Sequence, residues 1–418
     1  MVEIDQTYGD QSLGADATMQ ASEVLHKWLL RVCPEMHRAR RDALSAVVLA
    51  GVSGRRLTVT DLGRSIESDA KEKHCIKRAD RLLSNRHLQH ESAGVYAAIA
   101  RQLIGAQRRP VISVDWSDLD PSKRHFLLRA AIAAQGRSLT LYEEVHPLQG
   151  KDKPGVQQAF LKRLRAALPT HCRPIIVTDA GFRTPWFKQV QSLGWDWIGR
   201  VRNRHWVALN GDEWWVPCKS LYDEARATPK SLGEAKLTWR HAHPCRLVVY
   251  KAPHRGRSRL TRYGRRSRQI NSLRKSAAQL EPWLLATSLP LDTKLAKRVV
   301  NLYRQRMQIK EAFRDLKSAR FGLGLQLHLV HKLERIRVLL LVAHLALVLA
   351  WLIGKAVQLA GQHRHYQANT IKTRNVLSTI FIGLRAFNDQ RVQLRPADYL
   401  AARLALQQSV AQHCLQSR

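Results

Sequence analysis

The sequence predicts a mixed α/β domain that is preceded by a smaller all-helical domain. Helical periodicity dominates as far as about residue 107, and apolar runs typical of strands begin only after it. The runs at 110–115 and 174–179 each end in an aspartate, and helical segments separate the later strands. Hydrophobic residues make up 45% of the 418 residues, enough for packed cores. At roughly 100–200 residues per domain, this length suggests two to four domains.

The chain is strongly basic. Lys and Arg together number 69 and Asp and Glu number 33, so the formal net charge is 69 − 33 = +36. An excess of this size indicates a polyanionic partner, either nucleic acid or an anionic membrane surface. The six cysteines include no C-x-x-C pair, which argues against a zinc ribbon or a disulfide scaffold and favours a reducing compartment.

Two segments bear on export and on membranes. Residues 1–22 are polar and acidic, so we expect a disordered leader there and no secretory signal. Residues 338–354 form an apolar run of 17 residues, which is at the short limit for a membrane span and contains His344. We interpret this run as a buried helix of a large core, and we expect no membrane partner.

Residues 23–107 predict a helical DNA-binding domain. A short helix begins near Thr60, and a basic helix follows over Lys71–Leu83, an order typical of a helix-turn-helix-like module. The alternative is an ordinary three-helix domain with a solvated basic face. The charge of the whole chain favours DNA, and the residues expected to contact it are Lys73, Lys77, Arg78 and Arg81.

Residues 108–203 and 283–360 predict the α/β domain. Its apolar runs and helical segments follow the order β-β-β-α-β-α-β, with a hairpin at Gln135-Gly136-Arg137. The strands should deliver Asp115 and Asp179 to one end of the sheet, where sites form in open α/β folds. A further strand begins at Trp283, and one long amphipathic helix is expected over 294–316.

Residues 204–282 interrupt this pattern and predict a β-rich insertion. The stretch 251–275 contains ten basic residues in 25 and no acidic one. Such a run is usually a solvated loop, but this density favours contacts with phosphates, among them through Arg265 and Arg266. Residues 361–418 predict a helical C-terminal region for DNA contact or dimerisation.

Two aspartates at strand ends, together with an acid on a later helix, are typical of a site for two divalent cations. Carboxylate oxygens bind Mg²⁺, and two such ions stabilise the attacking and leaving oxygens of a displacement at phosphorus. The ordinary alternative is that both aspartates cap loops and helix N-termini. No nucleotide-binding loop of the G-x-x-x-x-G-K-[ST] type is present, so no nucleotide cofactor is expected.

Five segments carry a resemblance to a known family: VDWSD, QGRSLTLYE, VTDAGF, RMQIKEAFRDLKS and QANTIKTRNVLST, which begin at residues 114, 135, 177, 306 and 367. Over roughly residues 23–395 the chain resembles the DDE transposases of bacterial insertion sequences, in particular the insertion-sequence-four family and its Tn-ten type. The resemblance implies a ribonuclease H-like catalytic core with a β-strand insertion. It also implies Mg²⁺, with Mn²⁺ as a substitute, and a homodimer on two transposon ends.

The resemblance assigns roles to individual residues. Asp115 and Asp179 become the first two metal-binding catalytic carboxylates. Tyr303, Arg306 and Lys317 fit the family signature Y-x-x-R-x-x-x-E-x-x-x-x-x-x-K as contacts to DNA phosphates. Trp283 matches an aromatic residue that stacks on a flipped base.

The signature departs from the family at its glutamate, where this chain has Lys310 and carries Glu311 next to it. On a regular helix, Glu311 lies about 100° round from Lys310, so the two side chains leave different faces. Three interpretations remain open. The copy is catalytically impaired, or a helix irregularity lets Glu311 act as the third catalytic and metal-binding carboxylate, or another acid such as Asp118 compensates.

The implied reaction is cut-and-paste transposition. Hydrolysis at the transposon end frees a 3′-hydroxyl, which forms a hairpin on the opposite strand, and the reopened ends then attack target DNA. The expected partners are the terminal inverted repeats and target DNA, and the expected location is the bacterial cytoplasm, on the nucleoid. The alternatives are a transposon-end DNA-binding protein without catalysis and a resolvase on the same fold.

Overall fold

A computed structural model describes residues 20–414 except 135, 203, 204, 210, 212, 213, 254–264, 271, 274–276, 278–280, 369 and 372. The predicted leader therefore lies almost entirely outside the described residues, as does most of the basic run 251–275. The chain divides into two compact units. We call residues 1–95 with 314–408 the helical unit, and residues 96–313 with 409–418 the sheet unit.

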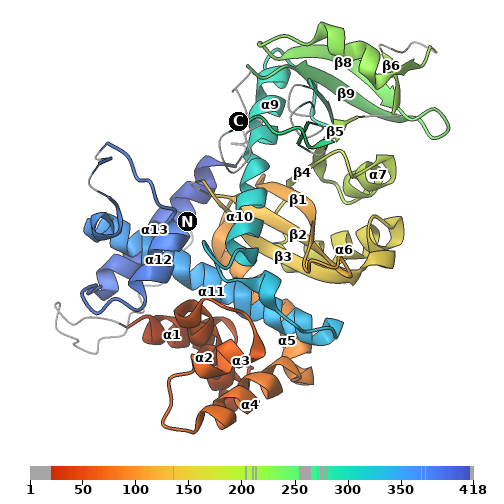
Figure 1. The fold of residues 1–418 in the computed structure, drawn as a ribbon. Coiled ribbons are helices and arrows are strands. Elements are labelled where there is room, and N and C mark those ends of the chain that lie inside the picture. Colours follow the sequence, from red (N-terminus) through yellow and green to blue (C-terminus); the bar gives the residue numbers. More distant parts are fainter. Residues whose placement is uncertain are drawn as a thin grey trace. The chain divides into compact units, whose positions relative to one another are not determined.

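The sheet unit is built on one mixed sheet, which has ten strands within the described residues (Figure 1). Its spatial order is β3-β2-β1-β4-β5-β10-β9-β8-β6-β7. The neighbours β1, β4 and β5 run parallel, and the other pairs run antiparallel. The bounds are β1 Val111–Asp118, β2 His125–Ala133, β3 Ser138–Pro147, β4 Ile175–Thr178, β5 Asp196–Val201, β6 Trp206–Leu209, β7 Val216–Pro217, β8 Lys230–Leu237, β9 His243–Tyr250 and β10 Trp283–Thr287.

The element order predicted for the α/β region is confirmed. Strands β1, β2 and β3 are followed by α6 (Pro154–Ala167), β4, α7 (Thr184–Ser192) and β5. The insertion does contain strands, β6 to β9, but they extend the same sheet, because β9 pairs with β10 beside β5.

A buried ion pair joins β2 to β3. Arg129 and Glu143 are cross-strand partners, and their side chains are 1% exposed, with Nη2 and Oε2 2.6 Å apart. The Tyr96 hydroxyl donates to Oε1 of the same carboxylate at 2.9 Å. Since both oxygens of Glu143 accept hydrogen bonds, the burial of this carboxylate is compensated.

The single helix expected over 294–316 is two helices, which corrects the prediction. α9 spans Leu295–Gln305, α10 spans Met307–Lys317, and a turn at Arg306 separates them. The Arg306 amide donates to the carbonyl of Tyr303, a three-residue spacing that tightens the turn. Arg306 is also buried, with its guanidinium against Asp115, so the break accompanies an inward-directed cation.

The helical unit contains α1 (Ala21–Val32), α2 (Arg38–Gly54), α3 (Val59–Arg64), α4 (Glu72–Leu83), α11 (Leu333–Leu359) and α12 (Thr379–Ala386). Three of the described helices contain a boundary between the units: α5 (Arg86–Ile104), α10 and α13 (Pro396–Gln412). α11 packs against α2, α4 and α12. It is the one described helix long and apolar enough to span a membrane, but 83% of its apolar window is buried, as expected for a core helix.

Two glycines set the crossing of α11 and α12. A Cβ atom on Gly354 would lie 1.8 Å from the carbonyl oxygen of Thr379, and one on Gly383 would lie 1.7 Å from that of Ala350. Neither position has room for a methyl group, so the two backbones touch directly. The apolar helix is therefore held by close backbone packing as well as by its side chains.

The Gly354→Ala variant should be less stable than the wild type by about 1–3 kcal/mol or more, because the added methyl group forces the two backbones apart. Gly94→Ala is the matched control: it lies within α5, and its added Cβ would meet nothing within 4 Å. That substitution should instead stabilise by roughly 0.5–1 kcal/mol. Thermal unfolding measures both changes, and a wild-type midpoint for Gly354→Ala would contradict the close crossing.

Candidate active site

The fold places the two aspartates next to each other. Strands β1 and β4 pair in parallel up to Val114 opposite Thr178, so the next residues in register are Asp115 and Asp179. Asp115 is 2% exposed, whereas Asp179 is partly buried and accepts a hydrogen bond from the Gly181 amide at 2.8 Å. The predicted placement of both residues at one end of the sheet is confirmed.

Two cations from the α9–α10 region lie against the same oxygen of Asp115. The Nζ atom of Lys310 is 2.6 Å from Oδ2, and the Nη1 atom of Arg306 is 3.2 Å from it. Arg306 is nearly buried, while the side chain of Lys310 is 44% exposed and enters from the solvent side. The carboxylate is thus neutralised by residues of the chain itself.

The electrostatic balance at Asp115 has two opposing parts. Burial raises the pKa of Asp115, and the neighbouring Asp179 carboxylate raises this pKa further. Lys310 and then Arg306 act in the opposite direction and favour the ionised form. A buried pair of carboxylates requires positive charge nearby, and here an ammonium and a guanidinium supply it.

Glu311 points elsewhere. Its Oε2 atom is 3.9 Å from Nη1 of Arg137, in the turn between β2 and β3, and its side chain is 42% exposed. Of the two neighbouring residues, Lys310 is therefore the one directed at Asp115. Asp118 stands three positions along β1 from Asp115, and strand alternation sends its side chain to the opposite face of the sheet.

Two residues near the aspartates, Asp152 and Arg129, are not predicted by any sequence pattern. Asp152 lies in the turn before α6 and has a positive φ of 59°. Burial raises the pKa of Asp152, and the nearby Asp179 carboxylate raises it by a smaller amount. Arg129 is the cross-strand partner of Asp115 on β2. Both are near the aspartates only because of strand pairing and loop geometry, which no local sequence pattern reveals.

The residues present do not fit a pair of divalent cations. Within the described part of the chain, no three His, Cys, Asp or Glu side chains gather into a group that could hold a metal ion. Hard cations need several oxygen ligands, and Lys310 instead puts a positive charge on Asp115, where such an ion would bind. The arrangement is an internal ion-pair cluster.

Of the other signature residues, Tyr303 faces inward. Tyr303 is 3% exposed and belongs to the core between the sheet and α9. Trp283 packs edge-to-face on it, with ring centroids 5.0 Å apart, and also on Tyr250, at 5.7 Å. The Arg306 guanidinium lies 5.4 Å from the centre of the Tyr303 ring. Lys317 ends α10 and belongs to the helical unit.

The residues predicted to bind DNA on α4 form a stripe. Lys73, Lys77 and Arg81 are exposed and spaced by four residues, so they share one helix face. Arg78 is partly buried and donates to the carbonyl of Asp42 at 3.3 Å. Arg265 and Arg266 are exposed within the basic run, of which residues 254–264, 271, 274 and 275 lie outside the described part.

Helix α3 and helix α4 pack closely. A Cβ on Gly63 would lie 2.4 Å from the Cα atom of Ile76, so only glycine fits there. The Thr58 side chain caps α3 by accepting from the amide of Asp61. The opposite face of α4 is buried, which leaves the basic stripe as its outer surface.

The Lys310→Glu variant should acquire a cation site that the wild type lacks, because a third carboxylate replaces the ammonium on Asp115. Adding Mg²⁺ or Mn²⁺ at roughly 100 times the dissociation constant should raise the free energy of unfolding of this variant by about 2.7 kcal/mol, seen as a higher thermal midpoint. The wild type should respond no more than Lys297→Glu, a control with the same charge change at an exposed position of α9. Equal stabilisation of wild type and Lys310→Glu would contradict the ion-pair interpretation.

Comparison with known families agrees with the mixed α/β fold. A family model described as a transposase DDE domain matches residues 106–349, which is more than half of the chain. The match covers β1 with Asp115, β4, the strands of the insertion and the helices α9 and α10. No curated protein matches the chain significantly. The chain belongs to the family of transposase DDE domains.

Proposed function

We propose that this protein is a transposase that binds transposon-end DNA but cleaves it poorly. The observation that carries the proposal is the 2.6 Å contact between Lys310 Nζ and Asp115 Oδ2. In a DDE site the third acidic position completes the negative charge that binds the catalytic cations. An ammonium at that position opposes the cations and occupies one of the two remaining carboxylates.

DNA binding is the part of the activity that the chain retains in this proposal. Its net charge of +36 and the exposed stripe of Lys73, Lys77 and Arg81 on α4 support a phosphate-contacting surface. We propose the terminal inverted repeats as the preferred duplex and a homodimer on two ends as the bound form. The resemblance to the insertion-sequence-four family and its Tn-ten type supports the inverted repeats as the bound DNA and the homodimer as the bound form. We propose the cytoplasm as the location.

A second candidate is a fully active transposase in which Glu311 is the third carboxylate. The break at Arg306 favours it, because α10 begins anew at Met307 and a rotation of about 100° would exchange Lys310 for Glu311. In this case the proposed route is cut-and-paste transposition through a DNA hairpin, with Mg²⁺ as the cofactor and Mn²⁺ as a substitute.

The two candidates predict different variants to be active. On a supercoiled plasmid that carries the DNA flanking this coding sequence, Lys310→Glu should nick in Mg²⁺ at least about tenfold faster than the wild type, or about 1.4 kcal/mol in the barrier. Lys297→Glu is the charge-matched control and should leave the slow rate unchanged. Adding Asp115→Asn to Lys310→Glu should abolish the gain, which would assign the cleavage to this site.

Rapid Mg²⁺-dependent nicking by the wild type that Glu311→Ala abolishes would overturn the first candidate and support the second. The products separate both from a resolvase on the same fold. Transposase chemistry leaves 3′-hydroxyl ends or hairpins, whereas a resolvase cuts four-way junctions. If every variant binds the duplex and none nicks it, only the DNA-binding part of the proposal is supported.

A further inference from the structure

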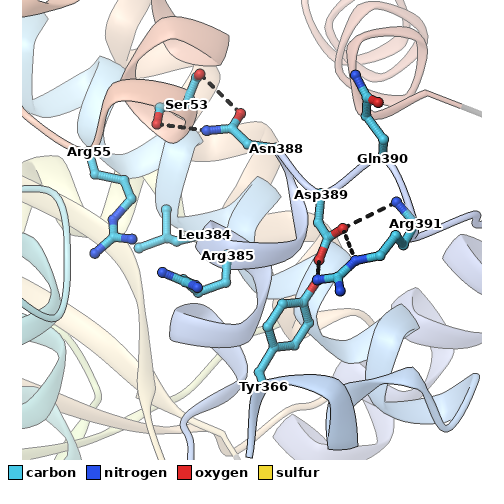
Figure 2. Close-up of a pocket in the computed structure, with 9 residues that line it drawn as sticks. All are labelled: Ser53, Arg55, Tyr366, Leu384, Arg385, Asn388, Asp389, Gln390 and Arg391. Carbon is cyan, nitrogen blue, oxygen red and sulfur yellow. Dashed lines mark hydrogen bonds and ion pairs between the residues drawn. The ribbon is translucent and has the colours of Figure 1, made fainter.

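The helical unit contains a pocket that the DDE site does not use. It has a volume of about 580 Å³ and is formed by the end of α2, the turn at 362–366, α12 and the loop after α12 (Figure 2). Most of its lining is polar or charged: Ser53, Arg55, Tyr366, Leu384, Arg385, Asn388, Asp389, Gln390 and Arg391. All of these residues lie within the one unit.

The polar wall of the pocket is held by its own hydrogen bonds. Asp389 binds the guanidinium of Arg391 through both oxygens, at 2.8 and 2.7 Å, and accepts from the Tyr366 hydroxyl at 2.9 Å. Asn388 donates to the carbonyl of Ser53 at 3.1 Å and accepts from its hydroxyl at 3.0 Å. The one carboxylate of the lining is thus already engaged at the wall.

Arg55 and Arg385 have no such carboxylate partner among the contacts of the described residues. Arg55 donates to the carbonyl oxygen of Arg320 at 3.3 Å and lies over the ring of Phe381, at 5.7 Å. These contacts orient the guanidinium without neutralising it. Arg385 is exposed at the pocket, and Figure 2 shows it beside Leu384 on the same side as Arg55.

The guanidinium groups of Arg55 and Arg385 repel each other electrostatically. Burial lowers the pKa of Arg55, and the positive charge of Arg385 lowers it further. Arg55 also ends α2 in the left-handed region, with φ of 56°, a backbone conformation that costs a residue with a side chain roughly 1–2 kcal/mol. The fold therefore holds a strained, partly desolvated cation next to a second cation.

The lining carries a net charge of three guanidiniums less one carboxylate, 3 − 1 = +2. An anion that touches Arg55 and Arg385 together would turn their mutual repulsion into two charge-assisted hydrogen-bonded contacts. Guanidinium groups suit phosphate oxygens, which they bind in a planar, bidentate manner. The excess of basic residues along the whole chain favours a phosphate that belongs to a polyanion.

We propose that this pocket binds one phosphodiester of a DNA backbone, with Arg55 and Arg385 on the same phosphate. The proposal rests on the proposed DNA-binding function and adds to it a contact site outside the DDE core. Phosphate contacts fix the position of a protein on the duplex and do not read sequence. The pocket would therefore anchor DNA to the helical unit whatever its base sequence.

The test is the salt dependence of binding of the full chain to a fluorescently labelled duplex. Loss of one phosphate contact makes the slope of log affinity against log salt shallower by about 0.9. Arg385→Gln and Arg55→Gln should each show this change. The double variant should lose no more than one contact, because the two residues share a phosphate. Arg385→Lys should keep the slope, since it keeps the charge.

Arg403→Gln is the matched control, because Arg403 is exposed on α13 in the same unit and lies outside the pocket. Its slope should equal that of the wild type. If the wild type does not bind duplex DNA, the proposed function fails and the pocket proposal fails with it. If the wild type binds and the pocket variants keep its slope, the pocket proposal alone is overturned.

A separate measurement distinguishes DNA from a free anion. Inorganic phosphate is added to the wild type and to Arg385→Gln, and thermal unfolding is followed. If phosphate stabilises only the wild type while both bind DNA with the same slope, the site takes a free phosphate and the proposal is wrong. If Arg385→Gln loses the stabilisation by phosphate and its salt-dependence slope for DNA binding is also shallower by about 0.9, the proposal is supported.

Discussion

Two carboxylates on neighbouring parallel strands, one of them almost fully buried, impose the main electrostatic constraint on the sheet unit. The pairing of β1 with β4 fixes Asp115 beside Asp179, so the two carboxylates stay close as long as the strands are paired. Positive charge must therefore be brought to the pair from elsewhere in the chain. Arg306 and Lys310 bring it, and the turn that divides α9 from α10 stands where the first of them turns inward.

The same constraint explains why the signature residues lie where they do. Tyr303 and Trp283 pack under the start of this turn, and the guanidinium of Arg306 lies against Tyr303 on its way to Asp115. In this structure Tyr303 packs against the guanidinium that reaches the carboxylate, and Trp283 packs against Tyr303. Tyr303 is buried, so its direct contact with a DNA phosphate would require a rearrangement, whereas Trp283 is only partly buried.

The sequence was sufficient where local patterns decide the outcome. Apolar runs that end in Asp115 and Asp179 predicted adjacent strand ends, and apolar run 338–354 predicted a buried helix. It was insufficient where a single residue or a pairing of strands distant in the sequence determines the structure. Periodicity does not detect a single-residue turn at Arg306, and no local pattern shows that β9 joins the sheet beside β10. Which of Lys310 and Glu311 is directed at Asp115 depends on that turn, and no sequence pattern reveals it.

The direct contact of α11 with α12 has a consequence for the surface of the helical unit. Helix α12 carries Arg385 two residues after Gly383, and that glycine touches the backbone of α11 without an intervening side chain. Side-chain packing can adjust through rotamers, but touching backbones leave no such freedom. The position of Arg385 therefore depends on Gly354 and Gly383, whose lack of a Cβ atom lets the two backbones touch. An exposed cation of the pocket is thus positioned by the contact between α12 and the buried helix α11.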